Sequence, residues 1–215
     1  MPTKEAGAPR FDGSRNSVTK ANQAAFEVGQ LTERMFHGYF ARCAAIEVAS
    51  NPEARKLVPR TLPGQLVPVG YITRKDGTQL GFHFPLYLDQ ARDNAEFAKV
   101  WLVGSLLAVG DALKPYRYFD HAPELEMIYH LRNGVAHGNV FKLTNDGLDR
   151  LKKYPAHNKL AWGRPKTKTT EYEIVGALHG QPVLFEFMGA GDVLDLLFSV
   201  SAYLSRMAHG CPLRP

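Results

Sequence analysis

The stretch Glu124-Leu-Glu-Met-Ile-Tyr-His-Leu-Arg-Asn-Gly-Val-Ala-His-Gly-Asn139 has the start and stop signals of a complete helix. Pro123 suits a first helical position, and the acidic residues that follow lie at the positive end of the helix dipole. Gly138 is suited to the position just after a helix. These signals predict a helix of roughly four turns that ends just after His137. We expect the rest of the chain to support this helix.

Three side chains near the end of the predicted helix have the chemistry to act on a phosphate. Arg132 carries a planar fork of donors, His137 exchanges a proton near neutral pH, and the Asn133 amide can orient either one. The negative end of the dipole favours a protonated His137, which suits general-acid catalysis or phosphate binding. Asn133 and His137 lie nearly on one face, whereas Arg132 is about 100° from Asn133 around the axis. A phosphodiester is therefore the natural target.

The same residues also have a purely structural interpretation. Arg132 would pair with a carboxylate, Asn133 and Gly134 would lie at a contact between helices, and His137 would cap the helix end. We favour the chemical interpretation because arginine, amide and histidine converge at one end of one helix.

Residues 132–137, Arg-Asn-Gly-Val-Ala-His, resemble the Arg-Asn-x-x-x-His signature of the HEPN superfamily (higher eukaryotes and prokaryotes nucleotide-binding). Gly138 matches the small residue that often follows the histidine. The resemblance implies a helical bundle, usually dimeric, in which two copies of the motif meet at the dimer interface. It also implies that Arg132 and His137 act on the scissile phosphate and that Asn133 supports them, with no metal or cofactor.

Two classes of function follow from this resemblance. The first is a metal-independent endoribonuclease that works by 2′-hydroxyl attack on the RNA phosphodiester, as in toxins and antiphage effectors. The alternative is a non-catalytic HEPN-type module that binds nucleic acid or a protein. The expected partners are RNA, a second copy of the chain that completes the site and, from the resemblance alone, an antitoxin or another regulatory partner.

Composition sets the expected compartment. The chain has 215 residues and a formal charge of +5, which is compatible with an anionic partner. Cys43 and Cys211 stand in no metal-ligand spacing, which fits a reducing cytosol. The first residues lack an apolar signal region, and the longest apolar run, residues 100–110, is too short to cross a bilayer. We therefore expect a cytoplasmic protein that has no membrane segment.

Other catalytic and metal-binding motifs have little support in the sequence. The remaining histidines form no HExxH or Cys/His pattern, so a zinc site is not predicted. Gly189 and Gly191 lack the lysine and the spacing of a P-loop, and no GxSxG occurs.

Residues 150–168 contain seven positive side chains and no acidic one. Removing these seven charges would change the net charge from +5 to −2, so the basicity is local. A local basic segment with interleaved Tyr154 and Trp162 is typical of a nucleic-acid footprint, and a solvated surface loop is the equally weighted alternative. The residues predicted to contact nucleic acid are Lys152, Lys153, Arg164, Lys166 and Lys168.

The sequence before the motif predicts a tail, two helices and a hairpin. Residues 1–15 are expected to be flexible, and Asn16 or Ser17 is expected to cap a helix that runs to about Ser50. Residues 66–84 alternate about a Lys-Asp-Gly-Thr turn, which predicts a β-hairpin. Residues 85–114 return to helical spacing, with Asp89 or Asp93 as cap. The inward side chains predicted for this helix are Phe97, Val100, Trp101, Gly104, Leu107 and Ala108.

The remaining segments complete a predicted four-helix bundle. The aromatic connection at residues 116–120 could stack on RNA bases, although packing between helices is the favoured interpretation. Residues 172–187 predict a second hairpin, and a last helix begins at Gly191 or Asp192 and closes at Gly210. The expected fold is mainly α: one HEPN-like four-helix bundle domain over residues 16–210, with the two hairpins inserted between helices.

Overall fold

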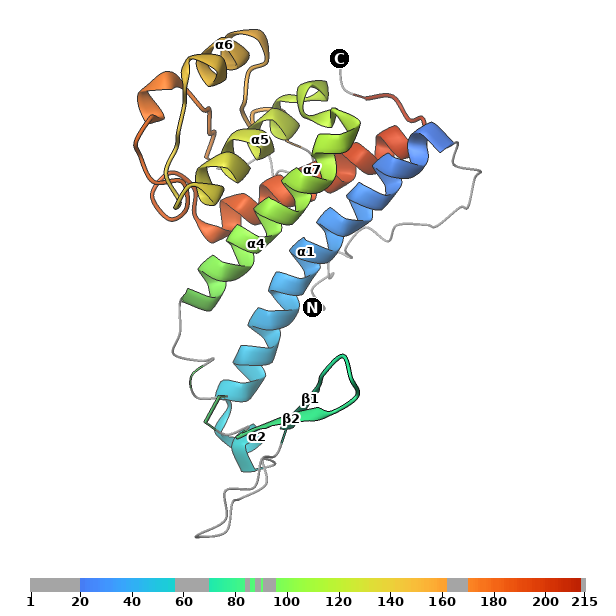
Figure 1. Cartoon of the computed structure of the whole chain (residues 1–215), viewed down its shortest axis with the longest axis vertical. Helices are drawn as coiled ribbons and strands as arrows, with labels where there is room; N and C mark the ends of the chain where they lie inside the picture. The colour runs from blue at the N-terminus through green and yellow to red at the C-terminus, as the bar shows by residue number, and fades with distance from the viewer. Residues whose placement is uncertain are drawn as a thin grey trace, which may run out of the picture.

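The structure is a computed structural model that describes residues 20–56, 70–83, 86–87, 90, 96–161 and 170–213 (Figure 1). The predicted tail at residues 1–15 lies outside the described residues. So do the predicted helix caps at Asn16 or Ser17 and at Asp89 or Asp93. The same holds for Trp162, Arg164, Lys166 and Lys168.

The described chain is mainly helical, as the sequence predicted, with one small antiparallel hairpin. Its α-helices are α1 (Lys20–Ser50), α2 (Pro52–Lys56), α4 (Glu96–Leu113), α5 (Pro123–Ala136), α6 (Asn145–Lys153) and α7 (Ala190–Ala208). Three short 3₁₀ helices are η1 (Lys114–Tyr116), η2 (Tyr118–His121) and η3 (Gly176–Leu178), and the hairpin strands are β1 (Gly70–Thr73) and β2 (Gln79–Phe82).

Four long helices, α1, α4, α5 and α7, pack around the core. α1 lies along α7, and α4 contacts α1, α5 and α7 (Figure 1). Gly29 lets α1 approach α7 closely, since a Cβ there would lie 3.3 Å from Leu204 Cβ, and Ser201 Oγ donates to the Gly29 carbonyl at 3.1 Å. The Trp101 ring nitrogen of α4 donates to the Met35 carbonyl of α1 at 3.0 Å. Large buried side chains of the core include Leu102, Leu106, Leu125, Met127, Ile128, Leu131, Leu196, Leu197 and Leu204.

The face that α4 turns to the core matches the predicted one only in part: Trp101 and Leu107 are partly buried and pack against the core, as predicted. Phe97 and Val100, which were expected to point inward, are 45% and 66% exposed, and Gly104 is exposed as well. The buried face instead carries Leu102, Ser105, Leu106, Val109, Gly110 and Leu113. α4 is apolar on most sides, so its periodicity does not select one face, and the packing of α1 and α5 makes the choice.

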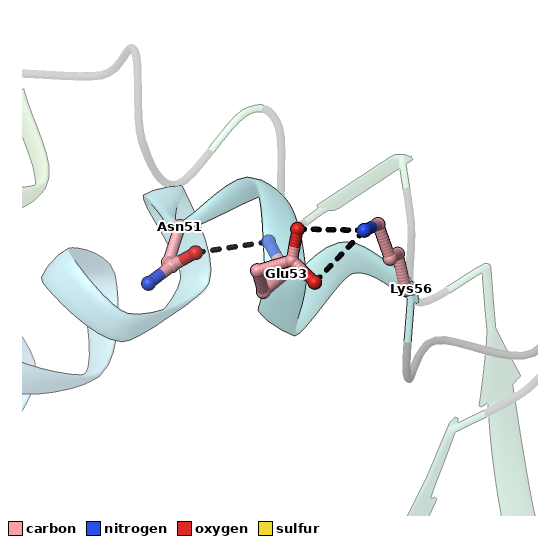
Figure 2. Close-up of polar contacts among 3 residues, drawn as sticks. All are labelled: Asn51, Glu53 and Lys56. Carbon is pink, nitrogen blue, oxygen red and sulfur yellow. Dashed lines mark hydrogen bonds and ion pairs between the residues drawn. The ribbon is translucent and has the colours of Figure 1, made fainter.

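The first helix ends at Ser50, as predicted. Asn51 Oδ1 accepts a hydrogen bond from the Glu53 backbone N–H at 2.9 Å, which starts the short helix α2 (Figure 2). The Glu53 carboxylate then accepts hydrogen bonds from Lys56 Nζ at 2.6 and 2.8 Å. A side-chain cap of this type satisfies one of the free N–H groups at a helix start.

The first predicted hairpin is confirmed in its described part. β1 and β2 pair with Gly70 opposite Phe82 and Thr73 opposite Gln79. Gly77 closes the turn with a φ of +85°, a conformation that glycine adopts without strain. Asp76 accepts hydrogen bonds from the Thr78 backbone N–H and hydroxyl, and these bonds lower the pKa of the Asp76 carboxyl.

The second predicted hairpin, at residues 172–187, is wrong. This segment contains η3 and isolated bridges. Ile174, Val183 and Leu184 are buried in the core, whereas Val175 and Phe185 are exposed. The backbone around Val183 pairs with residues that follow the motif helix: Val183 N–H donates to the Asn139 carbonyl and Phe141 N–H to the Gln181 carbonyl, both at 2.9 Å. The alternation of apolar residues in this segment therefore reflects partial burial against the core and backbone pairing with residues 139–141.

Helix α6 was not predicted. Leu148 and Leu151 are its side chains that pack on the core, and most of its other residues are charged or polar. Two apolar residues three apart give too weak a periodic signal for a helix prediction. Across the described ranges, no helix combines the length and the apolar character needed to span a bilayer.

Gly110 offers a direct test of the contact between α4 and α5. A Cβ at this position would lie 2.5 Å from Arg132 Cγ and 2.9 Å from Arg132 Cβ. We therefore expect Gly110→Ala to reduce the free energy of unfolding by about 1–3 kcal/mol, because the stem of Arg132 would have to move. The matched control is Gly191→Ala in α7, where nothing lies within 4 Å of the added carbon. Urea unfolding should find the control neutral or more stable; equal effects of the two substitutions would contradict the close approach.

Candidate functional site

The motif helix forms as the sequence predicted. α5 starts at Pro123, and the Leu125 and Glu126 backbone N–H groups both donate to the Ala122 carbonyl at 3.0 Å. His137 is the C-terminal cap, and its N–H donates to the Asn133 and Gly134 carbonyls at 3.2 Å. Gly138 follows with a φ of +86°, the left-handed conformation that ends many helices. The end of the helix therefore carries the three predicted side chains.

Arg132 is held by two partners. Its Nε and Nη2 donate to Asp111 Oδ1 of α4 at 3.0 and 2.6 Å, and its Nη1 lies 3.3 Å from Asn133 Oδ1. A guanidinium has five N–H groups, so these three hydrogen bonds leave one N–H on Nη1 and one on Nη2. The side chains of Arg132 and Asp111 are 28% and 57% exposed. The carboxylate pairing that the structural interpretation predicted is thus present, and the arginine keeps two donors for a ligand.

Asn133 and His137 differ in their surroundings. Asn133 is partly buried and accepts the hydrogen bond from Arg132, so it is placed to orient the guanidinium. His137 is exposed, and within the described ranges its imidazole has no hydrogen-bond or ion-pair partner. His137 lies five positions after Arg132, a rise of about 7.5 Å along a helix. The structure therefore joins Arg132 to Asn133 and leaves His137 free at the same helix end.

The chain after the motif is fixed by Asn139, a residue that sequence reasoning missed. Asn139 has a φ of +66°, and its side chain accepts from the Leu184 N–H at 2.8 Å and donates to the Leu184 carbonyl at 3.3 Å. Gly134 adds to this clamp, since a Cβ there would lie 2.4 Å from Val183 Cγ2. An asparagine directly after a stop glycine is a recognisable signal, because asparagine tolerates left-handed backbone better than most residues.

Asp111 was also missed as a site residue. It lies 21 positions before Arg132, and only the packing of α4 on α5 brings the two together. A carboxylate at the end of an apolar helix gives no local signal that it faces an arginine elsewhere in the chain. In the described ranges, no group of three or more His, Cys, Asp and Glu side chains is placed to hold a metal ion.

A buried charge lies on the other side of the motif helix. Glu126 is 1% exposed, and it accepts hydrogen bonds from Arg150 Nε at 2.5 Å and Arg150 Nη2 at 2.6 Å. The Arg150 guanidinium lies over the Tyr129 ring at 4.6 Å and near the Tyr154 ring at 5.3 Å. The hydrogen bonds to Glu126 raise the pKa of Arg150, so the cation persists throughout the physiological pH range. His130 Nε2 lies 3.3 Å from Glu126 Oε1 but makes no hydrogen bond.

The described part of the basic segment therefore divides into two kinds of residue. Arg150 serves the interior, and Lys159 pairs with Glu173. Lys152 and Lys153 are exposed on α6; Lys152 contacts Asp149 at 2.7 Å, and Lys153 lies 5.0 Å from the centre of the Tyr154 ring. A hydrogen bond to Tyr154 raises the pKa of Lys153. Both lysines keep their charge at the surface.

Comparison of the chain with models of protein families, with curated proteins and with solved structures found no match. The resemblance to the HEPN superfamily therefore rests on residues 132–137 and on their place at the end of a helix.

The pair formed by Glu126 and Arg150 leads to a stability prediction. Replacing Arg150 by Met leaves a carboxylate buried without its cation, which should reduce the free energy of unfolding by on the order of 3 kcal/mol. Lys152→Met on the same helix removes an exposed cation and should change stability by about 0.5 kcal/mol or less. Chemical denaturation of both variants measures the difference. A double variant, Glu126→Gln with Arg150→Met, should recover part of the loss; equal stability of the Arg150 and Lys152 variants would contradict the assignment.

Proposed function

We propose that this chain is a HEPN-type, metal-independent endoribonuclease whose site comprises Arg132, Asn133 and His137. The observation that carries the proposal is the arrangement at the end of α5. Arg132 is oriented by Asp111 and Asn133 and keeps two N–H donors, while His137 is exposed and unpartnered among the described residues. An oriented cation and a free imidazole at the end of the same helix are the minimum that phosphodiester cleavage needs in the absence of a metal.

The proposed reaction is a transesterification within the RNA backbone. The 2′-oxygen attacks the neighbouring phosphorus while the bond from phosphorus to the 5′-oxygen breaks. One proton leaves the 2′-hydroxyl and one is added to the departing 5′-oxygen, and His137 acts as the base or the acid. The two available donors of Arg132 neutralise the charge that builds on the phosphate oxygens. The products are a 2′,3′-cyclic phosphate and a 5′-hydroxyl.

Asp111 acts in this proposal as a positioning residue. An unpaired carboxylate here would repel a phosphate, but Asp111 accepts two hydrogen bonds from the Arg132 guanidinium. We propose that Lys152 and Lys153, together with Arg164, Lys166 and Lys168 of the basic segment, contact the phosphate backbone of bound RNA. The proposed compartment is the cytosol, in keeping with the two free cysteines, Cys43 and Cys211.

A test of cleavage addresses the motif directly. Purified protein in EDTA should cut single-stranded RNA, and His137→Ala and Arg132→Ala should each nearly abolish the rate, since a proton-transfer group is worth roughly 10²- to 10⁴-fold. Asn133→Ala should have a milder effect, because the amide carries no charge. The matched controls are His37→Ala and Arg34→Ala, exposed residues of α1 that should leave the rate unchanged.

The variants should melt within a few degrees of the wild type, and DNA should not be cut because it lacks the 2′-hydroxyl. Activity that EDTA removes, that persists in His137→Ala or that yields 5′-phosphate ends would rule out this mechanism.

We further propose that a second copy of the chain completes the site, because each chain supplies one motif arginine and one motif histidine. The exposed face of α4 supports this proposal. Phe97, Val100 and Gly104 lie on one stripe that continues to Asp111, the partner of Arg132. A self-complementary dimer through this apolar stripe would place both copies of the motif near the interface.

The dimer is tested by substitutions on equally apolar surfaces. Val100→Asp should convert the dimer to a monomer in light scattering and reduce cleavage at least tenfold, since a charge would be buried at the interface. Ile72→Asp, an exposed β-branched residue of the hairpin, is the control and should change neither property. A wild-type monomer at high micromolar concentration with full activity would exclude the composite site.

The second candidate function is a HEPN-type module that binds nucleic acid or a protein without turnover. One observation favours it: the shortest hydrogen bond of Arg132 goes to Asp111, which offsets its positive charge in the free protein. RNA binding without cleavage in the assay above would select this function. A role as a toxin or antiphage effector, and an antitoxin or regulator as partner, are proposals from the resemblance alone.

A further inference from the structure

The connection between α4 and α5 holds a backbone conformation that its sequence does not favour. Arg117 stands between η1 and η2 with φ and ψ of 56° and 36°, the left-handed region. Its N–H donates to the Lys114 carbonyl at 3.2 Å, as in a helix C-cap. Glycine takes this position at least cost, because a side chain is strained there. The chain thus keeps an arginine where its fold alone would prefer a glycine.

The left-handed turn brings two tyrosines together. Residues two apart in a regular helix point in different directions, yet the rings of Tyr116 and Tyr118 stack with centroids 5.5 Å apart and planes 27° apart. The Tyr118 ring is buried, and its centroid lies 5.3 Å from that of the His121 ring. Tyr203 Oη of α7 donates a hydrogen bond to the His121 carbonyl. The Tyr118 ring is therefore fixed, and Tyr116, whose ring stacks on it, is 47% exposed.

Two exposed cations lie close to Tyr116 in the sequence. Lys114 and Arg117 are both exposed, and among the described residues neither side chain has an ion-pair or hydrogen-bond partner. The two acidic residues of this stretch face elsewhere, since Asp111 holds Arg132 and Asp120 lies 3.9 Å from His121 Nε2. An exposed aromatic ring on a rigid base, in a segment with unpaired cations, is the combination on which unpaired nucleic-acid bases stack.

We propose that Tyr116 is a stacking platform for an unpaired base of single-stranded RNA and that Lys114 and Arg117 contact phosphates of the same strand. This inference rests on the proposed function, because the strand is the one whose phosphate Arg132 binds. Tyr116 follows Asp111 by five residues, roughly 9 Å along the helix axis. In this proposal the platform gives the site a subsite for a base on the segment that follows Asp111, the residue that orients Arg132.

The test uses a short single-stranded 2′-O-methyl RNA, which binds without being cut because its 2′-oxygen cannot attack. Fluorescence anisotropy measures its affinity for the wild type and for Tyr116→Leu, which should bind roughly 5- to 100-fold more weakly. Tyr116→Trp retains a ring and should bind as well as the wild type. An oligonucleotide in which every nucleotide is abasic should bind the wild type and Tyr116→Leu equally, since it has no base to stack.

Arg117→Gly separates binding from folding. It removes the backbone strain, so the melting temperature should rise, while RNA affinity falls and the salt dependence loses about one unit of log-log slope. A purely structural role for this turn would leave affinity unchanged. Unchanged affinity in Tyr116→Leu, or no binding of any oligonucleotide, would overturn the proposal.

The outcomes also distinguish this proposal from the proposed function. If cleavage in EDTA depends on His137 but Tyr116→Leu binds RNA as well as the wild type, the stacking platform is wrong and the proposed function stands. Binding that depends on Tyr116 in a protein that cuts no RNA would support the platform and select the non-catalytic module.

Discussion

The close approach of α4 and α5 at Gly110 is the constraint on which the site depends. The stem of Arg132 lies where a side chain of residue 110 would otherwise stand, and this position lets the guanidinium reach Asp111. A larger residue would push the arginine outward, where a long side chain samples many rotamers. Because the stem is confined by packing and the head by Asp111 and Asn133, the two remaining N–H groups have a defined direction. Folding thus already orders the Arg132 side chain, so ligand binding loses less conformational entropy.

The opposite side of α5 is held by a buried charge instead of apolar packing alone. Glu126 would be costly to bury without a partner, so Arg150 must enter the interior and bring α6 with it. This explains why a short, highly charged helix is ordered against the core. It also shows why a run of basic residues in a sequence is not a uniform surface: Arg150 stabilises the fold, whereas Lys152 and Lys153 remain at the surface.

Sequence reasoning found the elements whose signals are local. The ends of α5, the start and end of α7 and the turn of the first hairpin are each encoded within a few adjacent residues, and each lies at or close to its predicted place. It failed where the deciding partner is distant. The orientation of α4 depends on its contacts with α1 and α5. The Val183 N–H donates to the Asn139 carbonyl and not to the other half of the hairpin that was predicted at residues 172–187. For the same reason the sequence named Arg132, Asn133 and His137 but not Asp111.

The pair formed by Arg132 and Asp111 is compatible with both proposed functions, and its exposure decides how strongly it competes with a ligand. Ion pairs open to solvent contribute about 0–1 kcal/mol, and Asp111 is more than half exposed. A phosphate that accepts two charge-assisted hydrogen bonds from Arg132 gains more than that, since each bond to a charged group contributes roughly 1.5–3 kcal/mol. Asp111 can therefore remain in place and orient the guanidinium without preventing phosphate binding. Whether turnover follows then depends on His137, whose imidazole has no partner in the described structure to hold it away from a substrate.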